Sequence, residues 1–303
     1  MADGDAAFDM TGTGSPHARY AVLTGVGAVM ASLVVQNVGA AFAKLIFPLV
    51  GAFGVTALRI VLSAIILAAL LRPWRRSVPA GVLPALMGYG AMLGLMNLLI
   101  YQAFARIPIG VATGIEILGP LAVALTGSRK AIDRLWLAAA VLGLWLLIPL
   151  SAGSDLDPLG LFFAAGAALC WAFYIHFGAR ISPALGGDAV AWGMVVATVL
   201  TLPFGLASAG ASLFAPMILL VGLAVACLSS ALPYSLEMKA LRLLPSHVVA
   251  LLFSLYPVTG ALAGFAILGE RLAPAQWAGI MLIAVASAGC AATAARGGER
   301  DSV

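Results

Sequence analysis

PIGVATGIEILGPLAVALTGSRKAIDR, residues 108–134, returns in altered form 137 residues later. The residues that match without a gap are Pro108, Pro120, Asp133 and Arg134 in the first copy, and Pro245, Pro257, Glu270 and Arg271 in the second. Four matches at one spacing, two of them prolines twelve positions apart, indicate an internal duplication. The copies differ in charge, since Arg129 and Lys130 correspond to Ala266 and Ile267.

The composition around this duplication is that of a membrane protein. Of the 303 residues, 63% are hydrophobic and 9% are charged, whereas soluble domains carry about 25% charged residues. The mean hydropathy of +1.09 predicts several membrane-spanning helices and a partnership with membrane lipid. The net charge of +4 is explained by basic residues in the short segments between apolar runs, so no nucleic-acid partner is expected.

Ten apolar segments are each long enough, or nearly so, for a membrane span of about 20 residues. Their approximate ranges are 20–43, 53–71, 81–104, 109–127, 135–150, 159–180, two between 188 and 237 that part near 208–215, 246–268 and 274–295. The predicted fold class is therefore an all-α integral membrane protein with ten transmembrane helices. The duplication divides it into a tail (1–18), a first five-helix repeat (19–152), a second five-helix repeat (153–295) and a tail (296–303).

Because five is odd, the second repeat must enter the membrane from the opposite side. Loops and tails on the side of the N-terminus carry twelve basic residues: Arg19, Arg72, Arg75, Arg76, Arg129, Lys130, Arg134, Arg180, Lys239, Arg242, Arg296 and Arg300. The opposite loops carry only Lys44, Arg106 and Arg271. This bias predicts that both termini lie in the cytoplasm. Inverted repeats are typical of secondary transporters, whose sites lie near the bilayer midplane.

Polar residues within the first repeat are the main site candidates, because polar groups inside a membrane are costly and usually functional. Asn37, Arg59, Asn97 and Glu116 lie about 9–12 Å from the outer surface at 1.5 Å per residue, near the midplane. Helical spacing adds Tyr101 and Thr113 to the same faces. An arginine and a glutamate at one depth could bind the carboxylate and ammonium groups of a zwitterion.

Two structural alternatives remain open on the sequence alone. Arg59 could extend to the outer headgroups, with Glu116 only pairing with it. In the functional interpretation, a desolvated Glu116 could also take up a proton and couple transport to protons, and His176 is a second candidate for that role. Lys44 and Arg106 are expected to anchor the ends of spans.

In the second repeat, the candidates for substrate binding are Trp171, Tyr174, Ser254 and Tyr256. The aromatic ones could instead belong to an interfacial belt. Glu237 and Glu270 are expected at span ends, in structural roles. Cys170, Cys227 and Cys290 lie far apart in apolar runs, so neither a metal nor another cofactor is expected.

Several motifs resemble a known family: KLIFPLVGAFGVTALR (44–59), NLLIYQAFARIPIGVA (97–112), EILGPLAVAL (116–125), LPYSLEMKAL (232–241) and LGERL (268–272). Over about residues 28–285 the chain resembles the drug/metabolite transporter superfamily, and within it the threonine/homoserine exporters of the EamA family. The resemblance implies a ten-helix basket and export of amino acids in exchange for protons. That family usually has glutamate where this chain has Tyr256, which leaves Glu116 as the coupling carboxylate.

The sequence therefore predicts a secondary transporter of the bacterial inner membrane that exports small amino acids of the threonine/homoserine type by proton antiport. Exporters of aromatic amino acids or cationic drugs are the alternative within the superfamily. A membrane enzyme or a channel is the alternative of another class, and the motifs HExxH and GxxxxGK[ST] are absent from the sequence. The oligomeric state is left open, and a monomer is compatible with the sequence.

Overall fold

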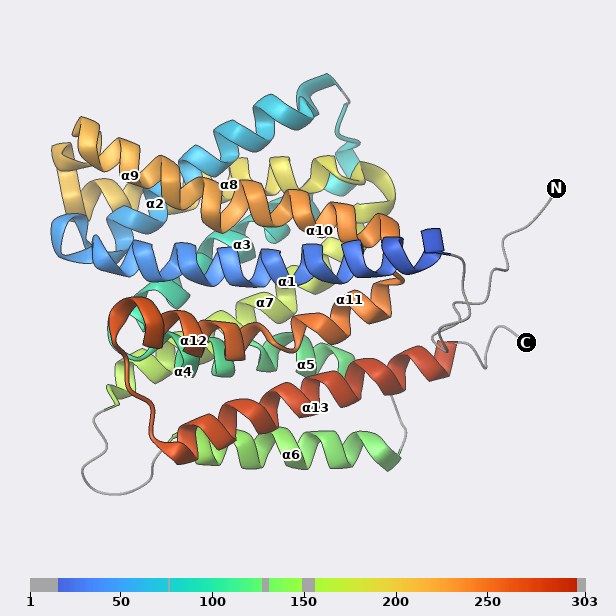
Figure 1. Cartoon of the computed structure of the whole chain (residues 1–303). Helices are drawn as coiled ribbons and strands as arrows, with labels where there is room; N and C mark the ends of the chain where they lie inside the picture. The colour runs from blue at the N-terminus through green and yellow to red at the C-terminus, as the bar shows by residue number, and fades with distance from the viewer. Residues whose placement is uncertain (1–15, 76, 127–130, 149–155, 299–303) are drawn as a thin grey trace.

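The computed structural model describes residues 16–75, 77–126, 131–148 and 156–298, and helices are the regular secondary structure of these ranges (Figure 1). The predicted all-α class is confirmed. The α-helices are α1 (Pro16–Leu45), α2 (Phe47–Leu71), α3 (Leu83–Phe104), α4 (Ile109–Glu116), α5 (Leu118–Thr126), α6 (Ala131–Leu147), α7 (Pro158–Leu185), α8 (Asp188–Ala209), α9 (Pro216–Ala226), α10 (Leu232–Leu243), α11 (Ser246–Phe253), α12 (Tyr256–Leu268) and α13 (Pro274–Gly298). Short turns η1 (Pro73–Arg75), η2 (Ala80–Val82), η3 (Gly210–Phe214) and η4 (Cys227–Ala231) join some of them.

Eight helices of the described ranges are long and apolar enough to cross a membrane. The segment Ile109–Leu125 is shorter, and α6 has 17 residues, so the count of ten spans stays a prediction. Arg76, Arg129, Lys130, the boundary near 152–153 and most of both predicted tails lie outside the described residues. The described ranges therefore contain only some of the basic residues on which the predicted orientation depends.

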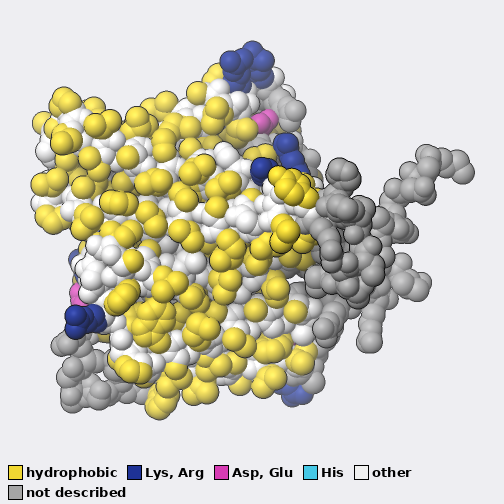
Figure 2. All heavy atoms as spheres, viewed as in Figure 1, with side chains coloured by type: hydrophobic (Ala, Val, Ile, Leu, Met, Phe, Trp, Pro, Cys, Tyr) yellow, Lys and Arg dark blue, Asp and Glu magenta, His cyan; other side chains and the backbone are white. Residues whose placement is uncertain are grey.

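The outer surface of the bundle is apolar. Val199, Phe162 and Met217 expose 72%, 69% and 69% of their surface, and hydrophobic side chains dominate the face seen in Figure 2, with Lys and Arg gathered near its margins. Exposed apolar surface of this extent is rare in soluble proteins, and lipid tails are its natural solvent. The chain is therefore a multi-pass membrane protein.

Each copy of the duplicated stretch forms a helix that is broken near its middle. In the first copy α4 ends at Glu116 and α5 begins at Leu118; in the second, α11 ends at Phe253 and α12 begins at Tyr256. Pro120 and Pro257 explain both breaks, because proline lacks the N–H that would bond the carbonyl four residues earlier. The two carbonyls deprived in this way belong to Glu116 and Phe253.

The halves of these broken helices are packed differently. α4 packs against α12, closely enough that a Cβ atom on Gly110 would lie 2.5 Å from the Cβ of Ala261. By contrast, α5 packs on α7 and α11 packs on α13. No comparable contact joins α5 to α11 among the described residues. Figure 1 shows that α1 begins and α13 ends at the same end of the bundle, the end at which α5 and α11 lie.

The opposite end is fastened by an ion pair between Lys44 and Glu270, whose Nζ and Oε1 atoms are 2.7 Å apart. The Lys44 ammonium group also donates to the carbonyl of Ile107 at 3.1 Å. The second carboxylate oxygen accepts a hydrogen bond from the backbone N–H of Ile109 at 2.9 Å, which caps the first turn of α4. Gly269, at φ 67°, gives the left-handed turn that brings Glu270 back over this end.

Candidate functional site

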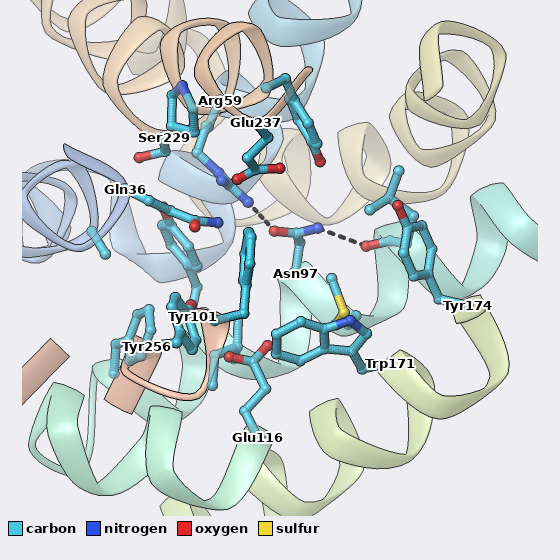
Figure 3. A pocket seen from close by; sticks show the side chains of 18 residues that line it. Gln36, Arg59, Asn97, Tyr101, Glu116, Trp171, Tyr174, Ser229, Glu237 and Tyr256 are labelled. Atoms are coloured by element: carbon cyan, nitrogen blue, oxygen red, sulfur yellow. Dashed lines mark hydrogen bonds between the residues drawn. The ribbon is translucent and has the colours of Figure 1, made fainter. Parts of the chain in front are cut away.

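A cavity of about 220 Å³ lies inside the bundle, between the two halves of the chain (Figure 3). Its wall combines charged, amide, hydroxyl and aromatic groups. The lining residues are Gln36, Ala40, Arg59, Leu93, Met96, Asn97, Ile100, Tyr101, Phe104, Glu116, Trp171, Tyr174, Ser229, Pro233, Tyr234, Glu237, Phe253 and Tyr256. They come from α1, α2, α3, α4, α7, η4, α10, α11 and α12.

Arg59 of α2 provides the positive charge of the cavity, and its side chain is 6% exposed. Its Nη2 atom donates a hydrogen bond to Oδ1 of Asn97, and its guanidinium carbon lies 4.8 Å from the centre of the Tyr101 ring, a cation–π distance. Asn97 is oriented in turn, because its Nδ2 donates to the Leu93 carbonyl at 2.7 Å. No carboxylate of the described residues lies within 4.0 Å of the guanidinium.

Glu116 faces the cavity from the last position of α4, where the Pro120 break lets the chain turn away. The residue is 3% exposed, and its Oε2 atom has no hydrogen-bond partner. The Arg59 guanidinium and the Tyr256 hydroxyl both lie within electrostatic reach of the carboxyl group. Glu116 therefore interacts with Arg59 across the cavity without a direct ion pair.

Aromatic side chains from the second half form another part of the wall. The rings of Trp171 and Tyr256 meet edge to face with 5.9 Å between their centres. Tyr174 stacks on Tyr89 of α3 at 4.5 Å and accepts a hydrogen bond from the Tyr89 hydroxyl at 2.8 Å. The aromatic candidates thus line the cavity.

The structure brings most of the predicted site residues together and leaves the others outside the cavity. Those that line it are Arg59, Asn97, Tyr101, Glu116, Trp171, Tyr174 and Tyr256. Those outside it are Asn37, Thr113, Ser254 and His176.

Asn37 and Thr113 are outside the cavity because they face a helix contact. Both flank Gly260 of α12, where an added Cβ would lie 2.7 Å from the Thr113 hydroxyl and 3.0 Å from the Asn37 carbonyl oxygen. Asn37 donates a hydrogen bond to the Thr259 hydroxyl at 2.9 Å, and its side chain is 1% exposed. These two residues join α1, α4 and α12 and do not meet the cavity.

Ser254 and His176 are turned away by helix geometry. The Ser254 hydroxyl donates to the carbonyl of Leu251 at 2.6 Å, while its neighbour Phe253 lines the cavity. His176 is exposed and lies against Phe177. It lies two positions after Tyr174, a rotation of about 200° on a helix, so it points away from the cavity that Tyr174 lines.

Sequence reasoning missed four polar residues of the cavity wall: Gln36, Ser229, Tyr234 and Glu237. Glu237 was expected at a span end, but the helix runs on to Leu243, which corrects that expectation. Ser229 belongs to the π-helical turn η4, a feature often found at functional sites. The signals in the sequence were the adjacent serines of an apolar run and the glutamate of LPYSLEMKAL.

The wall holds one cation, two carboxylates, amides and hydroxyls, a set suited to a small zwitterion. No group of three or more His, Cys, Asp or Glu side chains that could hold a metal occurs within the described part of the chain. Cys170, Cys227 and Cys290 are free thiols.

Comparison with known proteins gives four findings. A profile of the EamA-like transporter family matches residues 158–291. The threonine/homoserine exporter RhtA of Escherichia coli K12 is 44% identical over 248 residues, covering 82% of this chain and 84% of its own. The protein of the same name from Salmonella typhimurium SL1344 is 45% identical over 251 residues, covering 82% and 85%. A solved crystal structure at 20% identity covers 91% of this chain and 99% of its own with a TM-score of 0.56, which shows a shared fold.

Proposed function

Because this chain belongs to the EamA-like transporter family, we propose that it is a secondary transporter that exports threonine, homoserine and similar small amino acids from the cytoplasm. The observation that carries this proposal is the cavity wall, in which Arg59, Asn97 and Glu116 present opposite charges and an amide to one space. The relatives named as threonine/homoserine exporters support the same substrate class.

The size of the cavity favours a small substrate. Its volume of about 220 Å³ lies below the roughly 300–1,000 Å³ of pockets that hold drug-sized ligands. A cationic drug would also leave Arg59 without an anion. Aromatic amino acids remain the second candidate, because Trp171, Tyr174 and Tyr256 line the wall. Their rings are already partnered with other rings of the protein, which favours the smaller substrates.

The proposed architecture is a basket of ten transmembrane helices in two inverted five-helix repeats, residues 19–152 and 153–295, in the bacterial inner membrane. The matching breaks at Pro120 and Pro257 support the repeat. The start of α1 and the end of α13 at one end of the bundle fit an even number of spans. The bias of basic residues assigns that end to the cytoplasm.

Topology is tested with single cysteines in a variant that lacks Cys170, Cys227 and Cys290. Arg75→Cys and Asp157→Cys are expected to react with a membrane-impermeant thiol reagent from opposite sides, the second from outside. Labelling of both from outside would contradict the inverted arrangement.

Proton antiport is the proposed coupling, with Glu116 as the group that takes up the proton. Glu116 is enclosed and has an oxygen without a partner, so one oxygen of its carboxyl group is open to a proton. His176 is exposed outside the cavity, which favours Glu116 over His176 as the coupling group.

The experiment is transport by the full chain in proteoliposomes. Radioactive homoserine or threonine loaded into the proteoliposomes is expected to leave faster when a proton gradient directed inward is imposed. Loaded phenylalanine is expected to leave little faster than from liposomes that lack the protein. Arg59→Gln is the control that removes the cation of the cavity and should abolish the flux. Export of phenylalanine alone would show that the substrates are aromatic amino acids. Flux unaffected by the proton gradient would contradict antiport.

A further inference from the structure

Glu237 is a second carboxylate of the cavity, supplied by the second half of the chain. It lies in the middle of α10 (Leu232–Leu243) and lines the cavity with Tyr234, one helical turn before it. In Figure 3 its side chain projects into the cavity from the same wall as Arg59, whereas Glu116 projects from the opposite wall. Tyr234 lies within electrostatic reach of both Glu237 and Arg59, which places the two charges on a common side.

The orientation of Glu237 is set by α1. The hydroxyl of Ser32, a residue with no exposed surface, donates a hydrogen bond to Oε1 of Glu237 at 2.8 Å. The other oxygen, Oε2, has no hydrogen-bond partner among the described residues. One oxygen is therefore held by the protein while the other is free to meet a ligand.

Glu237 has no neutralising cation in the part of the chain that the structure describes. There, no Lys, Arg or His nitrogen lies within 4.0 Å of its carboxylate. Arg59 is a buried cation that likewise lacks an opposite charge, because no described carboxylate lies within 4.0 Å of it. Charges buried without counter-ions are costly, and a zwitterion bound between them would neutralise both.

The charge balance of the cavity wall indicates different roles for the two carboxylates, Glu116 and Glu237. Arg59 contributes one positive charge, and Glu116 and Glu237 contribute two negative charges when ionised. A zwitterion adds one charge of each sign, so one carboxylate remains without a cation. Glu116 is the more enclosed of the two at 3% exposure, so Glu237 is the carboxylate better placed to meet the ammonium group.

We propose that Glu237 binds the α-ammonium group of the exported amino acid through its free oxygen, while Arg59 binds the α-carboxylate. This assignment rests on the proposed function and gives the ammonium group a different partner from Glu116. The side chain of the substrate is then directed toward Asn97 and the wall that carries Glu116.

The test compares two ligands that differ only in the amino group: homoserine and 4-hydroxybutanoate. Binding of each to the purified full chain is measured by competition with labelled homoserine. The wild type is expected to prefer homoserine strongly. In Glu237→Gln the ratio of the two dissociation constants should fall about 100-fold, because a charge-assisted hydrogen bond to the ammonium group is lost. The Kd of 4-hydroxybutanoate should hardly change.

Three further variants make the result specific. Glu270→Gln alters a partly buried carboxylate outside the cavity and should keep the wild-type ratio, as should Glu116→Gln. Ser32→Ala leaves the carboxylate in place but frees its orientation, and should lower the ratio about threefold to tenfold. It also provides the measurement if Glu237→Gln does not purify as a folded protein.

A wild-type ratio in Glu237→Gln, or a loss of the ratio in Glu116→Gln instead, would overturn the assignment. A wild type that binds no homoserine would overturn the proposed substrate and not the assignment. The same variants are then compared with phenylalanine and 3-phenylpropanoate, which again differ only in the amino group, and the ratio decides the role of Glu237.

Discussion

The helix break between α4 and α5 and the break between α11 and α12 are built alike but carry different chemistry. Each follows from a proline, Pro120 in the first and Pro257 in the second. The residue whose carbonyl loses its helical donor is Glu116 in one copy and Phe253 in the other. Both side chains line the same cavity.

The two copies of the duplicated stretch share a broken helix but not their charges. The helix break occurs in both, because each copy has a proline inside its helical segment, and proline lacks the N–H that would continue the helix. The charges are divided unequally, since the first half supplies Arg59 and Glu116 and the second supplies Glu237 with most of the aromatic wall. Two helix breaks of the same kind therefore border a site whose charges are unequally distributed between the halves.

The largest effect is expected at the two residues that end α4 and α11. Glu116→Gln should lower homoserine transport by about 100-fold or more, because it removes a buried charge in the cavity at nearly constant volume. Phe253→Leu, at the equivalent position, should lower it by less than about threefold. Proteoliposome flux measures both, with size-exclusion profiles as the control for folding. Equal losses would mean that the two breaks do not differ in chemistry.

The second expected effect concerns the breaks themselves. Pro120→Ala and Pro257→Ala each restore an N–H donor, so both helices should straighten and move the neighbouring wall. A shift of about 1 Å at a site is enough to cost transport at least tenfold. Homoserine flux and binding are measured side by side. A loss in one variant alone would show that only that break shapes the cavity.

A smaller effect is expected at Tyr256, which stands in the second break and reaches toward Glu116. Tyr256→Phe removes a hydroxyl near that carboxyl group and should lower transport about threefold to tenfold. Tyr101→Phe is the matched control, because the Tyr101 hydroxyl is buried without a hydrogen-bond partner. Its transport should stay within about twofold of the wild type. A larger loss of transport in Tyr101→Phe than in Tyr256→Phe would show that the functional hydroxyl is that of Tyr101, in the first half of the chain.

The smallest effect is expected where the sequence suggested a site and the structure places none. Ser254→Ala and His176→Ala should leave homoserine flux within about twofold of the wild type at each pH tested, because neither residue lines the cavity. Flux is measured between about pH 6 and 8, where a histidine would titrate. A pH profile altered by His176→Ala would assign the coupling proton to that residue.

The helical class and most helix boundaries could be predicted from the sequence, because apolar length and proline positions act locally. The approximate range 20–43 and the helix α1 (Pro16–Leu45) differ by only a few residues. Depth along a helix brought Arg59, Asn97 and Glu116 to one level, and the structure places all three on the cavity.

Rotation about the helix axis could not be predicted in the same way. Asn37 lies at the depth of the site but faces Gly260, while its neighbour Gln36 lines the cavity. One residue turns a helix by about 100°, and only packing against the other helices decides which side faces inward. Glu237 was missed because it was expected at the end of a span, whereas α10 continues past it to Leu243.

The ion pair of Lys44 and Glu270 makes one end of the bundle harder to open than the other. It fastens α1, the start of α4 and the segment after α12 at the end of the bundle away from the termini, while α5 and α11 are packed apart at the other end. Opening the fastened end requires these three interactions to break, whereas no comparable contact joins α5 to α11 at the opposite end among the described residues. For a transport cycle that opens each end of the bundle in turn, we expect a higher activation barrier at the end that carries the ion pair.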